Sequence, residues 1–244
     1  MTAPVFLAEP GRLAADRVVL DGPEGRHAVT VRRLRPGERV DLTDGAGLLA
    51  ECLVAEVSGK DTLVLDVLTR HRYDPPSPRL VVVQALPKGD RGELAVETMT
   101  EVGVDEIVPW QADRCVTRWR PDRRDKALAR WRATAREAAK QSRRPRLPDV
   151  PDLATTDQVA ARLATAARAL VLHETATTPL RTVDLPGEGA IVVVVGPEGG
   201  ITDAELTRFT GSGATPVRLG PTVLRTSTAG TAAAAVLLTL TTRW

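Results

Sequence analysis

The strongest constraint on the fold is a run of five aliphatic residues, Ile191–Val195, that leads directly into the glycine-rich turn Gly196–Gly200. Such a strand is apolar along its whole length, which is typical of a parallel sheet covered on both faces. A second turn of this kind, Leu219–Thr226, follows. Ligands of such sheets bind where strands end and helices begin, so the two turns predict a small-molecule site. Neither turn has the spacing of a nucleotide phosphate-binding loop, which argues against ATP and NAD.

Strand-like and helix-like segments alternate from residue 80 onward, and this alternation predicts a parallel sheet with helices on both faces. The expected strands cover residues 80–84, 105–109, 169–172, 191–195 and 216–219. The expected helices cover residues 92–102, 121 to about 142, 158–167, a segment beginning at residue 202, and 227–240. Thr202 and Glu205 have the spacing of a capping box, which defines the start of the fourth helix.

The N-terminal part has a different pattern, with short strand candidates separated by turns, which is typical of a small β-barrel. The expected strands cover residues 17–20, 39–42, 48–57 and 62–68, with one helical stretch near 25–34. The proline-rich segment 73–78 fits neither a helix nor a central strand, so we expect a linker there. The sequence therefore predicts two domains, residues 1–73 and 74–244.

The charge is unevenly distributed, because the segment from Arg114 to Arg146 holds 13 Lys and Arg residues against three acidic ones. This predicts contact with a polyanion, although a solvated helix face in a chain with 29 Arg and 4 Lys is the alternative. Cys52 and Cys115 lack disulfide-framework or metal-site spacing, so we expect free thiols and no metal. No signal peptide or membrane segment is evident, and we expect a cytoplasmic protein.

Several motifs occur in one order along nearly the whole chain: Gln84–Asp90, Glu101–Val104, Glu137–Arg144, Gly196–Gly200 and Leu219–Thr226, with His27 and Val31–Gly37 in the N-terminal part. Together they resemble the RsmE family of 16S rRNA (uracil-N3)-methyltransferases. The resemblance implies a SPOUT-type α/β domain with a C-terminal trefoil knot, preceded by a PUA-like β-barrel that binds RNA. It also implies a homodimer that uses S-adenosylmethionine to methylate N3 of one uridine of 16S rRNA, near the decoding centre of the small ribosomal subunit.

Arg225 is the predicted catalytic residue, because a guanidinium there would stabilise negative charge on the uracil oxygens. A structural ion pair or a phosphate contact is the alternative. The predicted cofactor-binding residues lie in the two turns and beside them: Leu172, His173, Gly196, Pro197, Glu198, Gly199, Gly200, Leu219, Gly220, Leu224 and Ser227. The glycines would let the backbone approach the ligand, and the leucines would supply apolar walls. Turn geometry and core packing are the respective alternatives. Glu198 either binds the ribose or favours the following helix terminus.

Phosphate contacts with RNA are expected from two groups of arginines. One group belongs to the N-terminal domain and the other to the end of the basic helix: Arg32, Arg33 and Arg35, and Arg143, Arg144 and Arg146. Thr222, Ser227 and Lys140 stand where the family commonly has Arg, Glu and Glu. No mechanism can therefore use a guanidinium at 222 or a carboxylate at 227. Two alternatives remain open: a knotted methyltransferase acting on another RNA, and a non-catalytic RNA-binding or ribosome-assembly protein.

Overall fold

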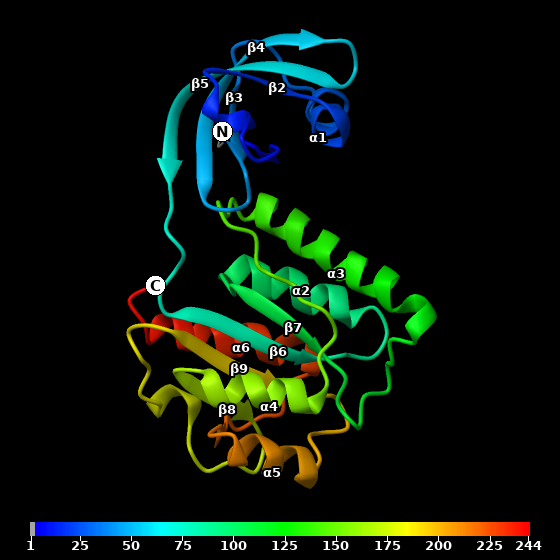
Figure 1. The fold of residues 1–244 in the computed structure, drawn as a ribbon, viewed down its shortest axis with the longest axis vertical. Coiled ribbons are helices and arrows are strands. Elements are labelled where there is room, and N and C mark those ends of the chain that lie inside the picture. Colours follow the sequence, from blue (N-terminus) through cyan, green and yellow to red (C-terminus); the bar gives the residue numbers. More distant parts are fainter. Residues whose placement is uncertain (1–2) are drawn as a thin grey trace. The chain divides into compact units, whose positions relative to one another are not determined.

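The computed structural model describes residues 3–244, and the chain divides into two compact units (Figure 1). Unit 1 comprises the residues up to Pro75 together with a later segment, Ala139–Leu147. Unit 2 comprises Pro76–Ala138 and Pro148–Trp244. The sequence-based division did not assign the later segment to the first unit. Among the described residues, no helix combines the length and the apolar character needed to cross a membrane.

Unit 1 is built on a five-stranded sheet in the order β1-β3-β4-β5-β2. The strands are β1 (Val5–Leu7), β2 (Arg17–Leu20), β3 (Arg39–Thr43), β4 (Leu48–Ser58) and β5 (Thr62–Arg72). β1 pairs with β3 in parallel, and the other neighbours are antiparallel. Alternate apolar side chains, among them Leu42, Leu63 and Leu65, are fully buried in a core that belongs to this unit alone. The four predicted strands are confirmed. β1 was missed because three residues are too few to reveal a period.

The helical stretch predicted near residues 25–34 is a short helix, α1 (Gly22–Arg26), that continues into a π-helical turn (His27–Val31). Gly25 is buried at their junction, and a Cβ atom there would lie 2.5 Å from the Leu20 carbonyl oxygen and 2.1 Å from that of Asp61. Only glycine fits so close to two backbone oxygens.

The segment Ala139–Leu147 joins unit 1 through polar contacts. Pro145 accepts hydrogen bonds from the Thr43 hydroxyl at 2.9 Å and the Gly47 backbone N–H at 3.0 Å. Lys140 Nζ lies 3.0 Å from Glu24 Oε1, and the lysine side chain is only 7% exposed. A buried charge is tolerated when an opposite charge and hydrogen bonds compensate for its lost hydration. The lysine that departs from the family pattern at position 140 therefore has a buried carboxylate partner.

Unit 2 contains a second five-stranded sheet in the order β10-β8-β9-β6-β7, with every neighbouring pair parallel. The strands are β6 (Arg79–Ala85), β7 (Glu106–Trp110), β8 (Arg168–Leu172), β9 (Ala190–Val195) and β10 (Thr215–Val217). Nearly all residues of the central strands are buried. The predicted parallel sheet and its five strands are confirmed, with ends that differ by one or two residues because pairing decides where a strand stops.

Five helices accompany this sheet: α2 (Arg91–Val102), α3 (Pro121–Gln141), α4 (Thr156–Thr165), α5 (Asp203–Gly211) and α6 (Thr226–Thr239). α2 and α6 pack together, and α6 contacts β6 and β9 (Figure 1). α4 and α5 form a second pair, with α4 against β8. Thr202 caps α5 in the predicted capping box with Glu205, which is confirmed.

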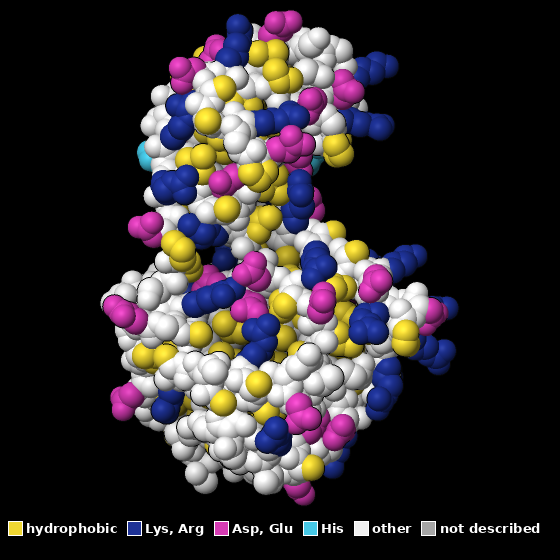
Figure 2. All heavy atoms as spheres, in the orientation of Figure 1, with side chains coloured by type: hydrophobic (Ala, Val, Ile, Leu, Met, Phe, Trp, Pro, Cys, Tyr) yellow, Lys and Arg dark blue, Asp and Glu magenta, His cyan; other side chains and the backbone are white. Residues whose placement is uncertain are grey.

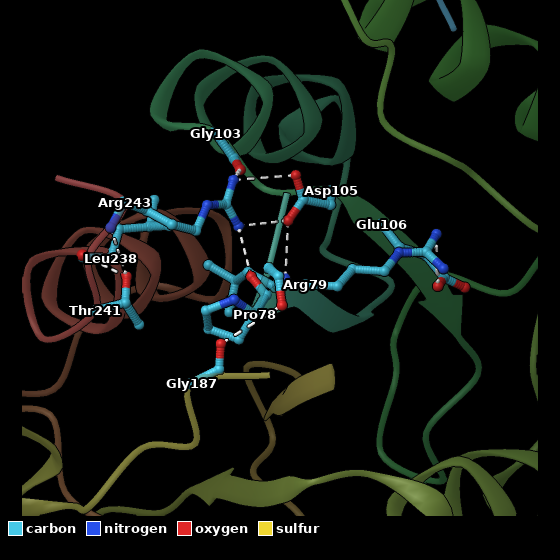
Figure 3. Close-up of polar contacts among 11 residues, drawn as sticks. Pro78, Arg79, Gly103, Asp105, Glu106, Gly187, Leu238, Thr241 and Arg243 are labelled. Carbon is cyan, nitrogen blue, oxygen red and sulfur yellow. Dashed lines mark hydrogen bonds and ion pairs between the residues drawn. The ribbon is translucent and has the colours of Figure 1, made fainter. Parts of the chain in front are cut away.

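The C-terminal end of unit 2 is held by a buried polar cluster (Figure 3). The guanidinium of Arg243 donates to both carboxylate oxygens of Asp105 and to the backbone carbonyls of Pro78 and Gly103. Asp105 also accepts a hydrogen bond from the Leu80 backbone N–H at 2.8 Å. Both side chains are largely buried, at 15% exposure for Arg243 and 8% for Asp105. This cluster ties the segment after α6 to the starts of β6 and β7.

Candidate functional site

A cavity of about 550 Å³ lies in unit 2 at the carboxyl ends of β8, β9 and β10. This volume falls within the range of about 300–1,000 Å³ that is typical of small-molecule sites. Because the strands are parallel, their carboxyl ends meet at one edge of the sheet, and the loops that follow them share one surface. The cavity is lined mainly by the turn Gly196–Gly200 and by the loop Leu219–Arg225.

The loop after β10 presents unused backbone groups to this cavity. The N–H groups of five of its residues donate no hydrogen bond within residues 3–244: Leu219, Gly220, Thr222, Val223 and Leu224. No atom lies within 4 Å of the place where a Cβ of Gly220 would stand. The loop therefore offers free donors beside open space, an arrangement that fits a ligand with ring nitrogens and hydroxyl oxygens.

The turn after β9 is shaped by packing. A Cβ atom on Gly196 would lie 2.7 Å from Ile201 Cγ1, and Gly200 has a φ of 76°. A Cβ on Gly199 would lie 3.0 Å from the Arg114 Cβ. Turn geometry and close packing thus account for these three glycines. At Gly220, in contrast, the space beside the Cα atom is open and could hold part of a ligand.

Two acidic residues connect this turn to neighbouring loops. Glu198 is exposed, and its Oε1 accepts a hydrogen bond from the Lys88 backbone N–H at 3.1 Å. Glu205 is buried and accepts from the backbone N–H groups of Asp113 at 2.8 Å and Thr202 at 2.9 Å. Glu198 therefore orders the loop after β6, and Glu205 ties the loop after β7 to the start of α5.

The residues that line the cavity include three arginines, Arg114, Arg218 and Arg225, and two glutamates, Glu174 and Glu198. Neither Arg218 nor Arg225 forms a side-chain ion pair with any described residue. Arg225 precedes α6 as its N-cap residue, with extended backbone and an exposed side chain. The alternative role for Arg225, a structural ion pair, is therefore not observed among the described residues. The arrangement can stabilise negative charge on a bound substrate.

Ten of the eleven predicted cofactor-binding residues line the cavity: Leu172, His173, Gly196, Pro197, Glu198, Gly199, Gly200, Leu219, Gly220 and Leu224. Ser227 lies behind this surface, buried in the first turn of α6. His173 Nδ1 lies 2.9 Å from the Thr175 hydroxyl. Arg114, Glu174 and Arg218 also line the cavity and were missed. Only one feature of the sequence indicated that Arg114 belongs to the site, namely its position at the start of the basic segment.

The six arginines expected to contact RNA all belong to unit 1. Arg32, Arg33 and Arg35 are exposed. The prediction that Arg143, Arg144 and Arg146 end the basic helix is wrong, because α3 ends at Gln141 and a φ of 58° at Arg143 stops it there. Arg146 donates to the Tyr73 carbonyl oxygen at 2.7 and 3.1 Å, so its guanidinium has a structural contact.

Basic side chains also lie along the outer edge of α3, interspersed with acidic ones (Figure 2). Arg130 pairs with Glu93 at 3.0 Å, and Arg132 pairs with Asp152 at 3.1 Å. These two arginines fit the alternative of a solvated helix face. The polyanion interpretation therefore depends on the other basic residues of the segment.

Both cysteines are free and buried. Burial raises the pKa of Cys52 to about 12 and also raises the pKa of Cys115. A thiol with a raised pKa is a poor nucleophile because little thiolate forms. Within residues 3–244, no group of three or more His, Cys, Asp or Glu side chains is arranged to hold a metal ion.

Comparisons with known proteins also divide the chain near residue 75, although the methyltransferase match includes the segment Ala139–Leu147 of unit 1. Residues 75–238 match the model of an RNA methyltransferase domain, and residues 20–68 match that of an RNA methyltransferase PUA domain. A Mycobacterium bovis protein named ribosomal RNA small subunit methyltransferase E is 50% identical over 93% of this chain and 87% of its own length. A Bacillus subtilis protein of the same name is 31% identical over 86% and 85%. The crystal structure of a Neisseria gonorrhoeae protein of this name, bound to S-adenosyl methionine, is 29% identical, covers 98% of both chains and has a TM-score of 0.84.

Proposed function

The chain belongs to the family of ribosomal RNA small subunit methyltransferase E, and on that premise we propose that it transfers a methyl group from S-adenosylmethionine to N3 of a uridine in 16S rRNA. The main support from this chain's own residues is the position of the cavity. The cavity lies at the carboxyl edge of the parallel sheet, within the matched methyltransferase domain, and is lined by the two turns of the family motifs. The fold also resembles the solved relative that holds S-adenosyl methionine.

The residues around the cavity fit this cofactor. Free backbone N–H groups of the Leu219–Leu224 loop would bind the adenine and ribose, with the open space at Gly220 letting them approach. Leu172, Leu219 and Leu224 would supply apolar walls for the adenine ring. Glu198 and His173 would contact the polar groups of the ligand. Ser227, which is buried behind the cavity surface, would support the cofactor-binding loop.

The chemistry that S-adenosylmethionine supplies is a sulfonium methyl group, which gains a bond to uracil N3 as its bond to sulfur breaks and leaves the electron pair on sulfur. The neutral base carries a proton on N3, and this proton must leave before or during the transfer. The guanidinium of Arg225 would stabilise the negative charge that then develops on the uracil oxygens. The rest of the catalytic effect would come from holding the base in line with the methyl carbon.

Finer features follow from the same premise. The C-terminal segment would form a trefoil knot: β10 pairs at the edge of the sheet, and α6 then passes back against β6 and β9. The protein would act as a cytoplasmic homodimer. Val223, an apolar residue that is 83% exposed in the cavity loop, is a side chain that a second copy would cover.

For RNA, we infer that the PUA domain and the arginines of unit 1 contact phosphates of 16S rRNA. Arg32, Arg33, Arg35 and Arg143 have exposed side chains, while Arg144 and Arg146 are half-buried. Phosphate contacts give affinity and orientation but little sequence information. Selection of one uridine near the decoding centre would then depend on the shape of the small subunit and on extrusion of the base into the cavity.

The test is mass spectrometry of nucleosides from small ribosomal subunits that lack the modification, after incubation with the protein and S-adenosylmethionine. We expect 3-methyluridine. Methylated product on a different RNA, with none on the subunit, would favour the alternative substrate. If the protein neither binds the cofactor nor produces methylated RNA, the result would favour the non-catalytic alternative.

A further inference from the structure

Arg114 is a cavity residue to which the family motifs assign no role in the chemistry. It lies in the loop after β7, far in sequence from both glycine turns, yet its guanidinium Nη1 donates to the Gly199 carbonyl oxygen at 3.2 Å. Its side chain is exposed to the cavity and forms no ion pair with any described residue. A guanidinium carries five N–H donors and no acceptor. Most of its donors therefore remain available to a ligand.

The backbone around Arg114 is firmly held. The preceding residue, Asp113, donates its N–H to the buried carboxylate of Glu205 at 2.8 Å. The following residue, Cys115, is buried and donates its N–H to the Ala112 carbonyl at 3.1 Å. Arg114 also lies close to Gly199, because a Cβ atom there would stand 3.0 Å from the Arg114 Cβ. The side chain thus starts from a fixed turn, which limits the entropy lost when it binds a ligand.

The edge of uracil that reacts presents an acceptor, a donor and an acceptor: O2, N3–H and O4. Release of the N3 proton to water spreads the negative charge over both oxygens. A donor-only cation beside either oxygen would stabilise this anion. Beside O4 it would also repel cytosine, which presents an amino donor at that position. Arg225 comes from the loop before α6, and Arg114 comes from the loop after β7. Two arginines from separate elements therefore line one cavity.

We propose that Arg114 binds the imide edge of the target uracil as a second guanidinium donor beside Arg225, stabilising the N3 anion and selecting uracil over cytosine. The inference rests on the proposed function, because it assumes that a uridine enters this cavity. Arg114 would touch the base itself, so it would act as a catalytic residue.

The test compares wild type, Arg114→Ala and Arg114→Lys on small subunits that lack the modification, with methyl transfer measured from about pH 6 to about pH 9. We expect the Ala variant to lose on the order of 100-fold in rate near neutral pH, as when one oxyanion donor is removed. A nearby cation lowers the pKa of an acid whose anion it contacts. Its removal raises the pKa of N3–H, so the loss should shrink as the pH rises. The Lys variant should retain part of the rate.

A chemical rescue separates this role from simple positioning. Small subunits made with 5-fluorouridine carry a more acidic N3–H, because fluorine withdraws electron density from the ring. On this substrate the Arg114→Ala defect should fall below about 10-fold. A loss that is equal at every pH and on both substrates would overturn the proposal.

Arg118→Ala is the matched control. Arg118 lies in the same loop, is exposed and donates to the Asp113 carbonyl at 3.1 Å, but does not line the cavity. An equal loss of rate in this control would show that loosening the turn is enough to explain the effect, and would overturn the proposal.

Binding of S-adenosylmethionine by calorimetry should be within about 3-fold of wild type in Arg114→Ala. A large loss there, with the rate restored at saturating cofactor, would reassign Arg114 to the cofactor's carboxylate. Absence of 3-methyluridine from wild type would instead refute the proposed function itself.

Discussion

Replacing Arg243 by alanine should destabilise unit 2 strongly, although the residue is the second from the C-terminus. The change removes the donors to Pro78, Gly103 and both oxygens of Asp105. It leaves a carboxylate that is 8% exposed without the guanidinium that compensates its charge. Breaking one side of a buried pair costs about 3–5 kcal/mol. For a unit of this size the melting temperature falls by about 2–4 °C per kcal/mol, so we expect a decrease of about 6–20 °C.

Tryptophan fluorescence during thermal unfolding and during urea unfolding is the assay, because all four tryptophans belong to unit 2. Trp110 is fully buried against Phe209, with ring centroids 5.3 Å apart, so its emission reports the loss of this core. The signal therefore follows the unit that holds Arg243, independently of unit 1.

Arg208→Ala is the control for the loss of one arginine from the same unit. Arg208 pairs with Asp157 at 3.1 Å, but the two side chains are 57% and 82% exposed. An exposed pair contributes about 1 kcal/mol or less. The double variant Arg243→Met with Asp105→Leu should recover part of the stability, because it removes both buried charges. If Arg243→Ala lost no more stability than Arg208→Ala, the reasoning about the buried pair would be refuted.

Four further outcomes are expected. Arg225→Ala should abolish formation of 3-methyluridine while the unfolding curve stays that of wild type; retained turnover would exclude Arg225 from the reaction. Gly220→Ala should weaken S-adenosylmethionine binding about 10-fold by calorimetry without lowering the melting temperature, because its Cβ would enter open cavity space. Gly230→Ala should instead lower stability by about 1–3 kcal/mol, because its Cβ would lie 2.7 Å from Met99 Sδ in the contact of α6 with α2. Arg143→Ala with Arg144→Ala should weaken binding to 16S rRNA and reduce the slope of log affinity against log salt by about 1–2, and an unchanged slope would show that these arginines do not meet phosphates.

The positions of most elements follow from local patterns. The aliphatic run that became β9 is buried almost throughout, and the capping box at Thr202 forms as its spacing indicated. The two glycine turns also face one cavity, since parallel strands end at the same edge. Such features depend on residues close in sequence, or on a rule that every parallel sheet obeys.

Local patterns fail where a contact joins distant segments. Nothing near Lys140 predicts its pairing with Glu24, and the return of Ala139–Leu147 to unit 1 has no compositional signature. The glycines of the first turn were predicted to make room for a ligand, but their neighbours Ile201 and Arg114 occupy that space.

The family, the two kinds of sheet and the turns that line the cavity were all predictable from the sequence, because motif order and hydrophobic period are properties of the chain alone. Three features became evident from the folded chain: Arg114 lines the cavity, Ser227 lies behind it, and Arg243 neutralises Asp105. Each of these depends on which side chains packing brings together across a long separation in sequence. That choice is made by the burial of the whole core and by compensation of buried charge, which no short stretch of sequence contains.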